Sequence, residues 1–352
     1  MPIPTLTRTG VSRRTALAGS AALATVAATR PARASGVVTV YSADGLKDGK
    51  PNWFDTVFAA FTQKTGIAVR YVEAGSGVVV NRVLAERSNP QADVLVTLPP
   101  FMQKAASLGV LAPMKPSSLP VIPASTRSAR DLWFPLVNNY ACWIYNTAEL
   151  KAPPASYAAL LAPGLKNRLQ YSTPGQAGDG TAVMLEIIEA MGGADQGFAY
   201  LHKLQANNLG PSASTGRLAG LVDKGEILVA NGDVQMNFAQ MRQYPHLGIF
   251  FPAHDGRRIT MPIPYDIALV KNAPHAAAAG RLIDFLLGRE AQDSVYDIAR
   301  GFPVRTDVPA RGKTAEALAG IMHGVDVWSP DWTRVLGGLD ANITSWHRVT
   351  GS

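Results

Sequence analysis

The sequence predicts an α/β protein built from two doubly wound α/β lobes. Strand-like and helix-like segments alternate along most of the chain, and turns rich in Gly, Ser and Thr follow several predicted strands. No repeat of about 20–50 residues is visible. With 352 residues, of which 47% are hydrophobic and 17% charged, the chain is long enough for one large or two mid-sized domains and too apolar to be disordered.

The first 34 residues have the features of an export signal. The arginine pair at 13–14 precedes a weakly apolar, alanine-rich run at 16–29, and small residues at 32 and 34 place a signal-peptidase site before Ser35. The segment around the pair resembles a twin-arginine export signal, although Ala16 replaces the usual phenylalanine; an ordinary secretion signal with a chance arginine pair is the alternative. The run is too short to span a bilayer. We therefore expect the mature protein to be soluble and periplasmic.

The next sixty residues predict three strands separated by two helices. Apolar, β-branched runs at 37–42, 67–72 and 93–97 are bounded by turn residues, as is typical of buried strands. Between them, apolar side chains recur at helical spacing from 53 to 61 and again around 80–84. This order and spacing predict a parallel sheet with right-handed crossovers.

The rest of the chain continues the alternation. Residues 132–145 form a long aromatic and apolar segment, and an alanine-rich helix carries Leu282, Phe285 and Leu286 on one face. Further helices are expected at 181–191 and 215–224, and further strands at 226–230, 248–251 and 265–270.

Composition and motifs argue against several classes of function. The net charge of +7 is concentrated at the start: five arginines and no acid lie in the first 34 residues, and the remainder has 28 basic against 26 acidic residues, so no nucleic-acid partner is expected. The single cysteine, Cys142, excludes an intrachain disulfide and a cysteine-based zinc site. Phosphate-loop, dinucleotide, zinc-protease and nucleophile-elbow motifs are missing. We expect neither an enzyme nor a bound cofactor or metal.

Four turns rich in Gly, Ser and Thr open predicted helices directly after strands. Backbone N–H groups at a helix start carry partial positive charge, hydroxyls add uncharged donors, and glycine lets an anion approach the backbone. Ordinary helix capping is the alternative for each turn alone. Together, at the carboxyl ends of strands, the turns favour a small anion held by neutral donors. The candidates are Ser42, Ser76, Gly77, Thr173, Gly180, Thr181, Ser214 and Thr215.

Acidic residues lie in or beside the same loops and could hold the cationic end of the same ligand. The candidates are Asp44, Glu73, Asp179 and Asp266. Solvated loop acids and N-caps are the alternative. Tyr140 and Tyr265 could wall such a pocket, although aromatic residues in apolar strands are usually core.

Several segments resemble a known family. Residues 38–46, 75–80 and 87–96 (VTVYSADGL, GSGVVV and RSNPQADVLV) are similar to the periplasmic 2-aminoethylphosphonate-binding proteins of ABC importers. The wider family, extracellular solute-binding proteins of type 1, shares segments at 224–226, 265–270, 279–287 with Gln292, and 301–305. The resemblance covers roughly residues 37–308.

This resemblance implies a periplasmic binding protein fold of type II, in which two lobes joined by crossing hinge strands enclose a ligand. Segments 132–145 and 261–267 would be the first two crossings, and 304–308 a third. The implied division is 35–138 plus 266–306 for the first lobe and 139–265 plus 307–352 for the second.

The resemblance also implies a non-enzymatic, monomeric receptor that delivers 2-aminoethylphosphonate to a membrane permease. Other ligands of the same fold remain open: a phosphate ester, phosphonoacetate or a polyamine. Ferric-ion binders of the family use two adjacent tyrosines, which this sequence lacks. An exported phosphoester hydrolase and a structural envelope protein are the alternatives from other classes.

Overall fold

The computed structural model describes residues 36–352, which lie within one unit of the chain, residues 34–352. The export signal expected at 1–34 lies outside the described residues. Of the helices in the described part, none is both long enough and apolar enough to cross a bilayer.

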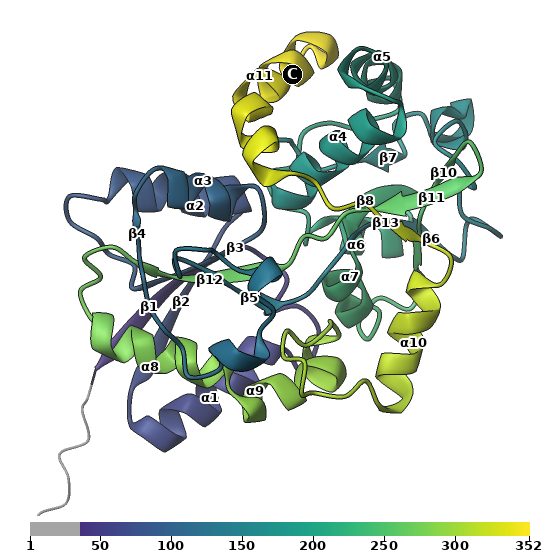
Figure 1. The fold of residues 1–352 in the computed structure, drawn as a ribbon. Coiled ribbons are helices and arrows are strands. Elements are labelled where there is room, and N and C mark those ends of the chain that lie inside the picture. Colours follow the sequence, from purple (N-terminus) through teal and green to yellow (C-terminus); the bar gives the residue numbers. More distant parts are fainter. Residues whose placement is uncertain (1–35) are drawn as a thin grey trace, which may run out of the picture. The chain divides into compact units, whose positions relative to one another are not determined.

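The first lobe is built around a six-stranded sheet (Figure 1). Its strands lie in the order β2-β1-β3-β12-β4, and β5 also pairs with β12. Their bounds are β1 (Val37–Ser42), β2 (Ala68–Glu73), β3 (Val94–Thr97), β4 (Leu111–Ala112), β5 (Phe134–Val137) and β12 (Tyr265–Val270). The first three are parallel, as predicted, whereas β12 runs antiparallel to β3, β4 and β5. The sheet is therefore mixed, because β12 enters it from the other lobe.

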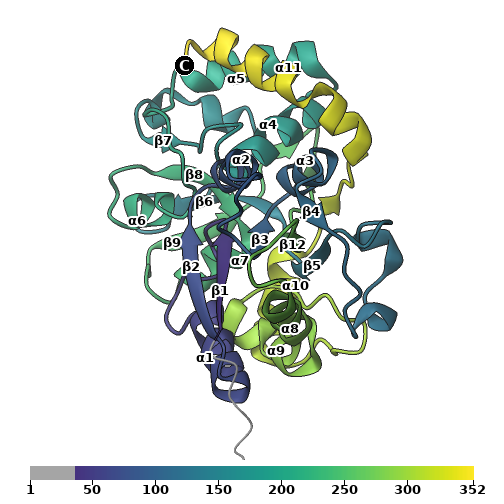
Figure 2. The ribbon, with the colours of Figure 1, turned by 90° about the vertical axis from the view of Figure 1, so that its left-hand side faces the viewer.

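Helices cover both faces of this sheet (Figure 2). They are α1 (Trp53–Thr65), α2 (Ser76–Ala85), α3 (Phe101–Ser107), α8 (Ala276–Leu287) and α9 (Arg289–Asp293), followed by a π-helical turn, η5 (Val295–Ala299). Helix α1 shows why they form: the Asn52 side chain caps its start by accepting from the Asp55 N–H, and Gly66 ends it in the left-handed region (φ 75°).

The second lobe is built around a four-stranded sheet in the order β7-β8-β6-β9. Its strands are β6 (Ala141–Asn146), β7 (Leu169–Gln170), β8 (Val229–Asp233) and β9 (Leu247–Phe250). Only β7 and β8 are parallel. The helices of this lobe are α4 (Gly178–Ala190), α5 (Ala194–Gln205), α6 (Leu218–Asp223), α7 (Val234–Gln240), α10 (Gly312–Met322) and α11 (Trp332–Thr350).

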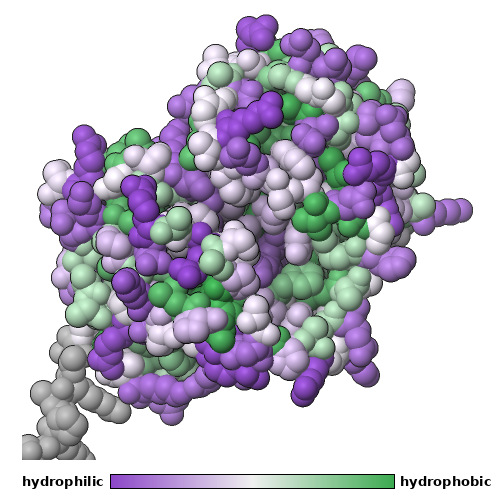
Figure 3. Space-filling model, in the orientation of Figure 1, coloured by the Kyte–Doolittle hydropathy of each residue, from purple (hydrophilic) through white to green (hydrophobic). Residues whose placement is uncertain are grey.

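Short elements complete the described chain. A small sheet contains β10 (Ala253–His254), β11 (Arg257–Thr260) and β13 (Asp326–Val327). Short 3₁₀ turns are η1 (Leu119–Val121), η2 (Ala124–Thr126), η3 (Ala159–Leu161) and η4 (Pro163–Leu165). Polar and apolar side chains are interspersed on the face shown in Figure 3.

Adjacent backbone segments connect the two sheets. Residues 138–140 link β5 to β6, and residues 261–264 lead into β12. They are hydrogen-bonded to each other, since Ala141 N–H donates to the Met261 carbonyl (3.1 Å) and Ile263 N–H to the Asn139 carbonyl (2.9 Å). A third segment joins them through a bridge between Asn138 and Phe302.

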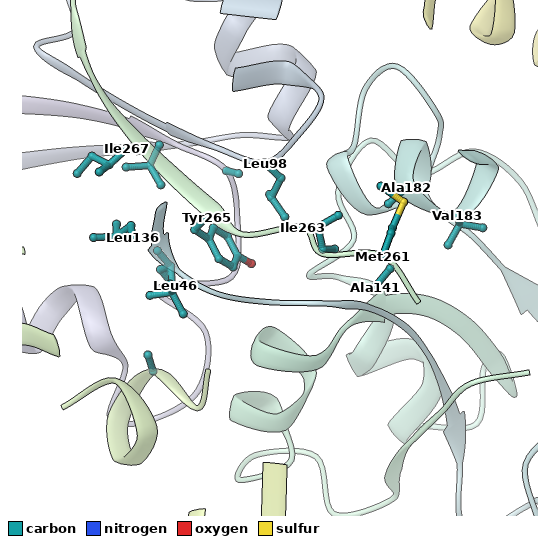
Figure 4. Close-up of a cluster of buried hydrophobic side chains, with 14 of the residues drawn as sticks. Leu46, Leu98, Leu136, Ala141, Ala182, Val183, Met261, Ile263, Tyr265 and Ile267 are labelled. Carbon is teal, nitrogen blue, oxygen red and sulfur yellow. The ribbon is translucent and has the colours of Figure 1, made fainter. Parts of the chain in front are cut away.

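One apolar cluster continues from lobe to lobe along these segments. Figure 4 shows Tyr265 and Leu98 on the first-lobe side, Ile263 and Met261 on the crossing segment, and Ala182 in the second lobe. The crossing strands are thus part of the hydrophobic core.

Two predicted boundaries in the second lobe were wrong. The helix expected from 215 begins at Leu218, because the Thr215 hydroxyl bonds to Ser172 and the chain turns there. The strand expected at 226–230 is Val229–Asp233, because the N–H groups of Glu226 and Ile227 return to the Leu221 carbonyl.

Candidate functional site

The first-lobe side of the candidate site is the loop after β1. Ser42 is buried, and its hydroxyl donates to the neighbouring Ala43 carbonyl (2.7 Å), so this hydrogen bond stabilises the loop. Asp44 reaches the second lobe: its Oδ2 accepts from the Ser214 hydroxyl (2.5 Å) and from the Gly216 N–H (3.0 Å).

The start of α2 also touches the second lobe. The Gly77 N–H donates to the Gln176 carbonyl (2.9 Å), and a Cβ on Gly77 would lie 2.2 Å from the Gly175 carbonyl oxygen. The buried Ser76 hydroxyl has no hydrogen-bond partner in the described part of the chain. It lies against the first residue of α4, since a Cβ on Gly178 would be 2.6 Å from it. The starts of α2 and α4 therefore meet across the lobe boundary.

The second-lobe side is a network of uncharged donors below the start of α4. The Thr215 hydroxyl donates to Ser172 Oγ (2.9 Å), and the Asn231 amide donates to the same oxygen (3.1 Å). Gly180 packs on this network so closely that a Cβ would lie 2.1 Å from the Ser172 carbonyl oxygen. The N–H groups in the first turn of α4 have no partner within the helix.

Two predicted threonines support this loop from within. Thr181 Oγ1 accepts from the Gly175 N–H (2.9 Å) and donates to the Ala177 carbonyl (2.9 Å). Thr173 Oγ1 accepts from the Ser212 N–H (3.1 Å). Both hydroxyls hold neighbouring loops together.

Asp179 lies in the first turn of α4 and is almost completely buried. Its Oδ1 has no hydrogen-bond partner among residues 36–352. Burial raises the pKa of this carboxyl well above its ordinary value, and the nearby charges of Asp233 and Asp44 raise it further. A buried carboxyl oxygen without a hydrogen-bond partner is costly to keep in a fold.

Two further aspartates lie in the same region, and neither was among the site residues predicted from the sequence. Asp233 caps α7, with Oδ1 accepting from the Met236 N–H (2.6 Å), and its Oδ2 accepts from the Tyr265 hydroxyl (3.0 Å). Burial raises the pKa of Asp233 to about 6. Burial and the charge of Asp44 raise the pKa of Asp48 to about 8. Asp233 was missed because the strand that it ends was placed three residues too early.

Tyr265 lies at the centre of this acidic group. It is fully buried, and its pKa is raised well above the ordinary value by burial and then by the charges of Asp233, Asp179, Asp44 and Asp48. Its hydroxyl points away from the first-lobe strands (Figure 4).

The other predicted residues lie elsewhere. Glu73 is exposed and accepts from the Tyr71 hydroxyl (2.8 Å). Tyr140 packs edge-on against Phe302 at the first crossing, with ring centroids 5.4 Å apart. Asp266 is fully buried with both oxygens unpartnered in the described structure, and burial alone raises its pKa. Since no charge of the aspartates around Tyr265 contributes to that shift, Asp266 lies apart from this group.

Among residues 36–352, the acidic group has no basic partner. In the described structure, no lysine or arginine lies within 4.0 Å of the carboxylates of Asp44, Asp48, Asp179 or Asp233. Among these residues, no group of three or more His, Cys, Asp or Glu side chains is arranged to hold a metal ion. The arrangement can therefore attract an organic cation beside uncharged hydrogen-bond donors.

Residues 47–293 match the family model described as bacterial extracellular solute-binding protein. The chain belongs to this family. Its sequence is 53% identical, over 92% of this chain and 96% of the relative, to the "Putative 2-aminoethylphosphonate-binding periplasmic protein" of Salmonella typhimurium. The predicted resemblance is confirmed at the family level.

Solved structures confirm the fold class. The periplasmic binding protein P5PA superposes with a TM-score of 0.77 at 19% identity, covering 90% of this chain and all of that one. AfuA from Actinobacillus pleuropneumoniae, solved with exogenous fructose-6-phosphate bound, gives 0.74 at 20% identity, covering 90% and 99%. The protein is a periplasmic solute-binding protein of an ABC transporter, and this class is not enzymatic.

Proposed function

We propose that this solute-binding protein captures 2-aminoethylphosphonate between its lobes and delivers it to the permease of its ABC transporter. One observation carries the proposal: within the described part of the chain, the starts of α2 and α4 meet at a Ser76 hydroxyl that has no hydrogen-bond partner, beside aspartates that have no basic partner. The name of the Salmonella relative supports the choice of ligand.

The phosphonate end fits the meeting point of the two helix starts. Two helix N-termini supply partial positive charge from opposite lobes. Ser76, Ser172 and Thr215 add hydroxyls, and Gly180 allows a close approach to the backbone of α4. None of these donors carries a full charge, so a small anion can be held and released without breaking a buried ion pair.

The ammonium end fits the acidic group. Asp179, at the start of α4, offers an oxygen that has no partner in the described structure, and Asp44 lies opposite it in the first lobe. Hydrogen bonds between an ammonium and a carboxylate are short and strong in a buried site. A carboxylate from each lobe would make the contact depend on closure of the lobes.

The size of the ligand sets a limit on affinity. Its roughly seven heavy atoms, at a ceiling of about 1.5 kcal/mol each, allow about 10 kcal/mol of binding free energy. That corresponds to a dissociation constant on the order of tens of nanomolar. Contacts made by both lobes would stabilise the closed state, which differs from the open one by a hinge motion at residues 138–140 and 261–264.

Calorimetry of the mature protein tests the proposal. We expect 2-aminoethylphosphonate to bind at least a hundredfold more tightly than ethylphosphonate, which lacks the ammonium, because the aspartates would otherwise remain unpaired. Asp179→Asn should remove most of that preference, and Glu189→Asn, on the exposed face of the same helix, should not. Tighter binding of ethanolamine phosphate would assign the site to phosphate esters instead. No heat with any of the three ligands would refute the proposal.

A further inference from the structure

Asp44 and Ser214 make a contact between the two lobes. Asp44 belongs to the loop after β1, and Ser214 to the loop before α6, 170 residues later. Both donors to Asp44, the Ser214 hydroxyl and the Gly216 N–H, bond to the same carboxylate oxygen, Oδ2.

The loop that supplies these donors is held in place by its own lobe. The Ser212 hydroxyl donates to the Ser214 carbonyl (2.7 Å), and the Thr173 N–H donates to the Ser212 carbonyl (2.7 Å). At the other end, the Gln240 amide donates to the Gly216 carbonyl (3.0 Å). The two donors are therefore preorganised before Asp44 arrives.

The geometry leaves the second carboxylate oxygen of Asp44 for another partner. In the described structure no donor bonds to Oδ1, and no lysine or arginine pairs with this aspartate. The Ser214 hydroxyl and the Gly216 N–H are already used, so neither is free for an anionic group. An ammonium that meets Oδ1 would find a carboxylate whose direction is set from the opposite lobe.

We propose that the Ser214 hydroxyl and the Gly216 N–H bind Oδ2 of Asp44 when the lobes close. This contact orients the other oxygen, Oδ1, toward the ammonium of the ligand. This inference rests on the proposed function and changes the role of Ser214 from a phosphonate ligand to a positioning residue. It explains how closure and the selection of an aminophosphonate are coupled: the ammonium acceptor is oriented only in the closed form.

Affinity measurements separate the two roles of Ser214. Ser214→Ala should weaken 2-aminoethylphosphonate binding roughly tenfold, as expected for losing a hydrogen bond to a charged group, and leave the weaker binding of ethylphosphonate unchanged. Ser214→Thr, which keeps the hydroxyl, should restore the preference for the aminophosphonate. In an Asp44→Asn background, Ser214→Ala should have little further effect. An equal loss for both ligands, or additive effects of the two substitutions, would show that Ser214 contacts the phosphonate and would overturn the inference.

A distance measurement without ligand keeps the inference testable if the proposed ligand is wrong. Spin labels on cysteines introduced at the exposed positions Ser107 in α3 and Ala199 in α5 report the separation of the lobes. The native Cys142 is buried, so the label attaches to the introduced cysteines. Ser214→Ala and Asp44→Ala should each reduce the closed population, and the double variant should reduce it no further. An unchanged closed population would overturn the inference, whereas failure of the wild type to bind 2-aminoethylphosphonate would overturn only the proposed function.

Discussion

Buried carboxyl groups dominate the chemistry of this protein at the scale of single residues. Glu186 in α4 is buried and accepts from the Tyr157 hydroxyl (3.1 Å), while its Oε2 has no partner in the described structure. Burial raises its pKa to about 8. The folded protein therefore keeps this carboxyl protonated at a pH where the unfolded chain ionises it.

This pKa predicts how stability changes with pH. The raised pKa contributes stability that is fully present below the ordinary glutamate pKa and is lost as pH rises toward about 8. Between those values the free energy of unfolding should fall by about 1.4 kcal/mol per pH unit for this single group.

Glu186→Gln keeps the acceptor for Tyr157 and should reduce the measured slope by about 1.4 kcal/mol per pH unit, because glutamine does not titrate whereas Asp48 and Asp233, whose pKa values are also raised, still do. Chemical denaturation at pH 5, 6.5 and 8 measures the slope directly. Glu189→Gln, on the exposed side of the same helix, should retain the wild-type slope. Identical slopes in the Glu186 variant and the wild type would show that another group titrates instead.

At the scale of single elements, α4 is specialised at its start. Gly180 would be a poor choice for helix propensity alone, since glycine costs about 1 kcal/mol relative to alanine inside a helix. A Cβ on Gly180 would lie only 2.1 Å from the Ser172 carbonyl oxygen, so there is no room for a side chain at this position. The close approach between α4 and the end of β7 therefore requires glycine.

Two glycine substitutions in helices should have opposite effects. Gly180→Ala should lower the free energy of unfolding by about 1–3 kcal/mol, because the backbone oxygen of Ser172 must move. Gly280→Ala in α8, where nothing lies within 4 Å of an added Cβ, should raise it by about 0.5–1 kcal/mol. Thermal or urea unfolding of both variants tests the pair. A stabilised Gly180 variant would mean that this contact is loose.

At the scale of the whole described structure, the two lobes are held together in several places besides the candidate site. Lys104 Nζ in α3 pairs with Asp340 in α11 (2.9 Å). The Arg242 guanidinium donates to the Pro51 carbonyl (3.2 Å). These contacts are exposed or small, so each contributes little, and closure depends on the fit of the facing backbones.

Gly77 provides the test of that fit. Gly77→Ala should prevent the observed approach of the lobes, because its Cβ would lie 2.2 Å from the Gly175 carbonyl oxygen. We expect ligand affinity to fall at least tenfold while the melting temperature changes little, since alanine favours α2 but its Cβ would lie 3.0 Å from Cε1 of Phe101 in the same lobe. The spin-label distance between α3 and α5 should shift to the open value.

Val78→Ala supplies the matched control, because Val78 is the next residue of α2 and its side chain is exposed. Its affinity and label distance should match the wild type. If Gly77→Ala binds as tightly as the wild type, the start of α2 does not limit closure.

The sequence alone identified the family, the first three strands and the loops from which Asp44, Asp179 and Ser214 come. Those features depend on local patterns: β-branched runs, helical spacing and turn residues, which act over a few neighbours.

Only the tertiary structure decided which side chains meet. Asp233 joins the acidic group because β8 ends at this residue. Ser214 contacts Asp44 because the fold brings together two loops that are 170 residues apart in the sequence. The free energy of such contacts comes from burial and from partners that the local sequence does not specify. That is why residues suited to a site could be named in advance, but their roles within it could not.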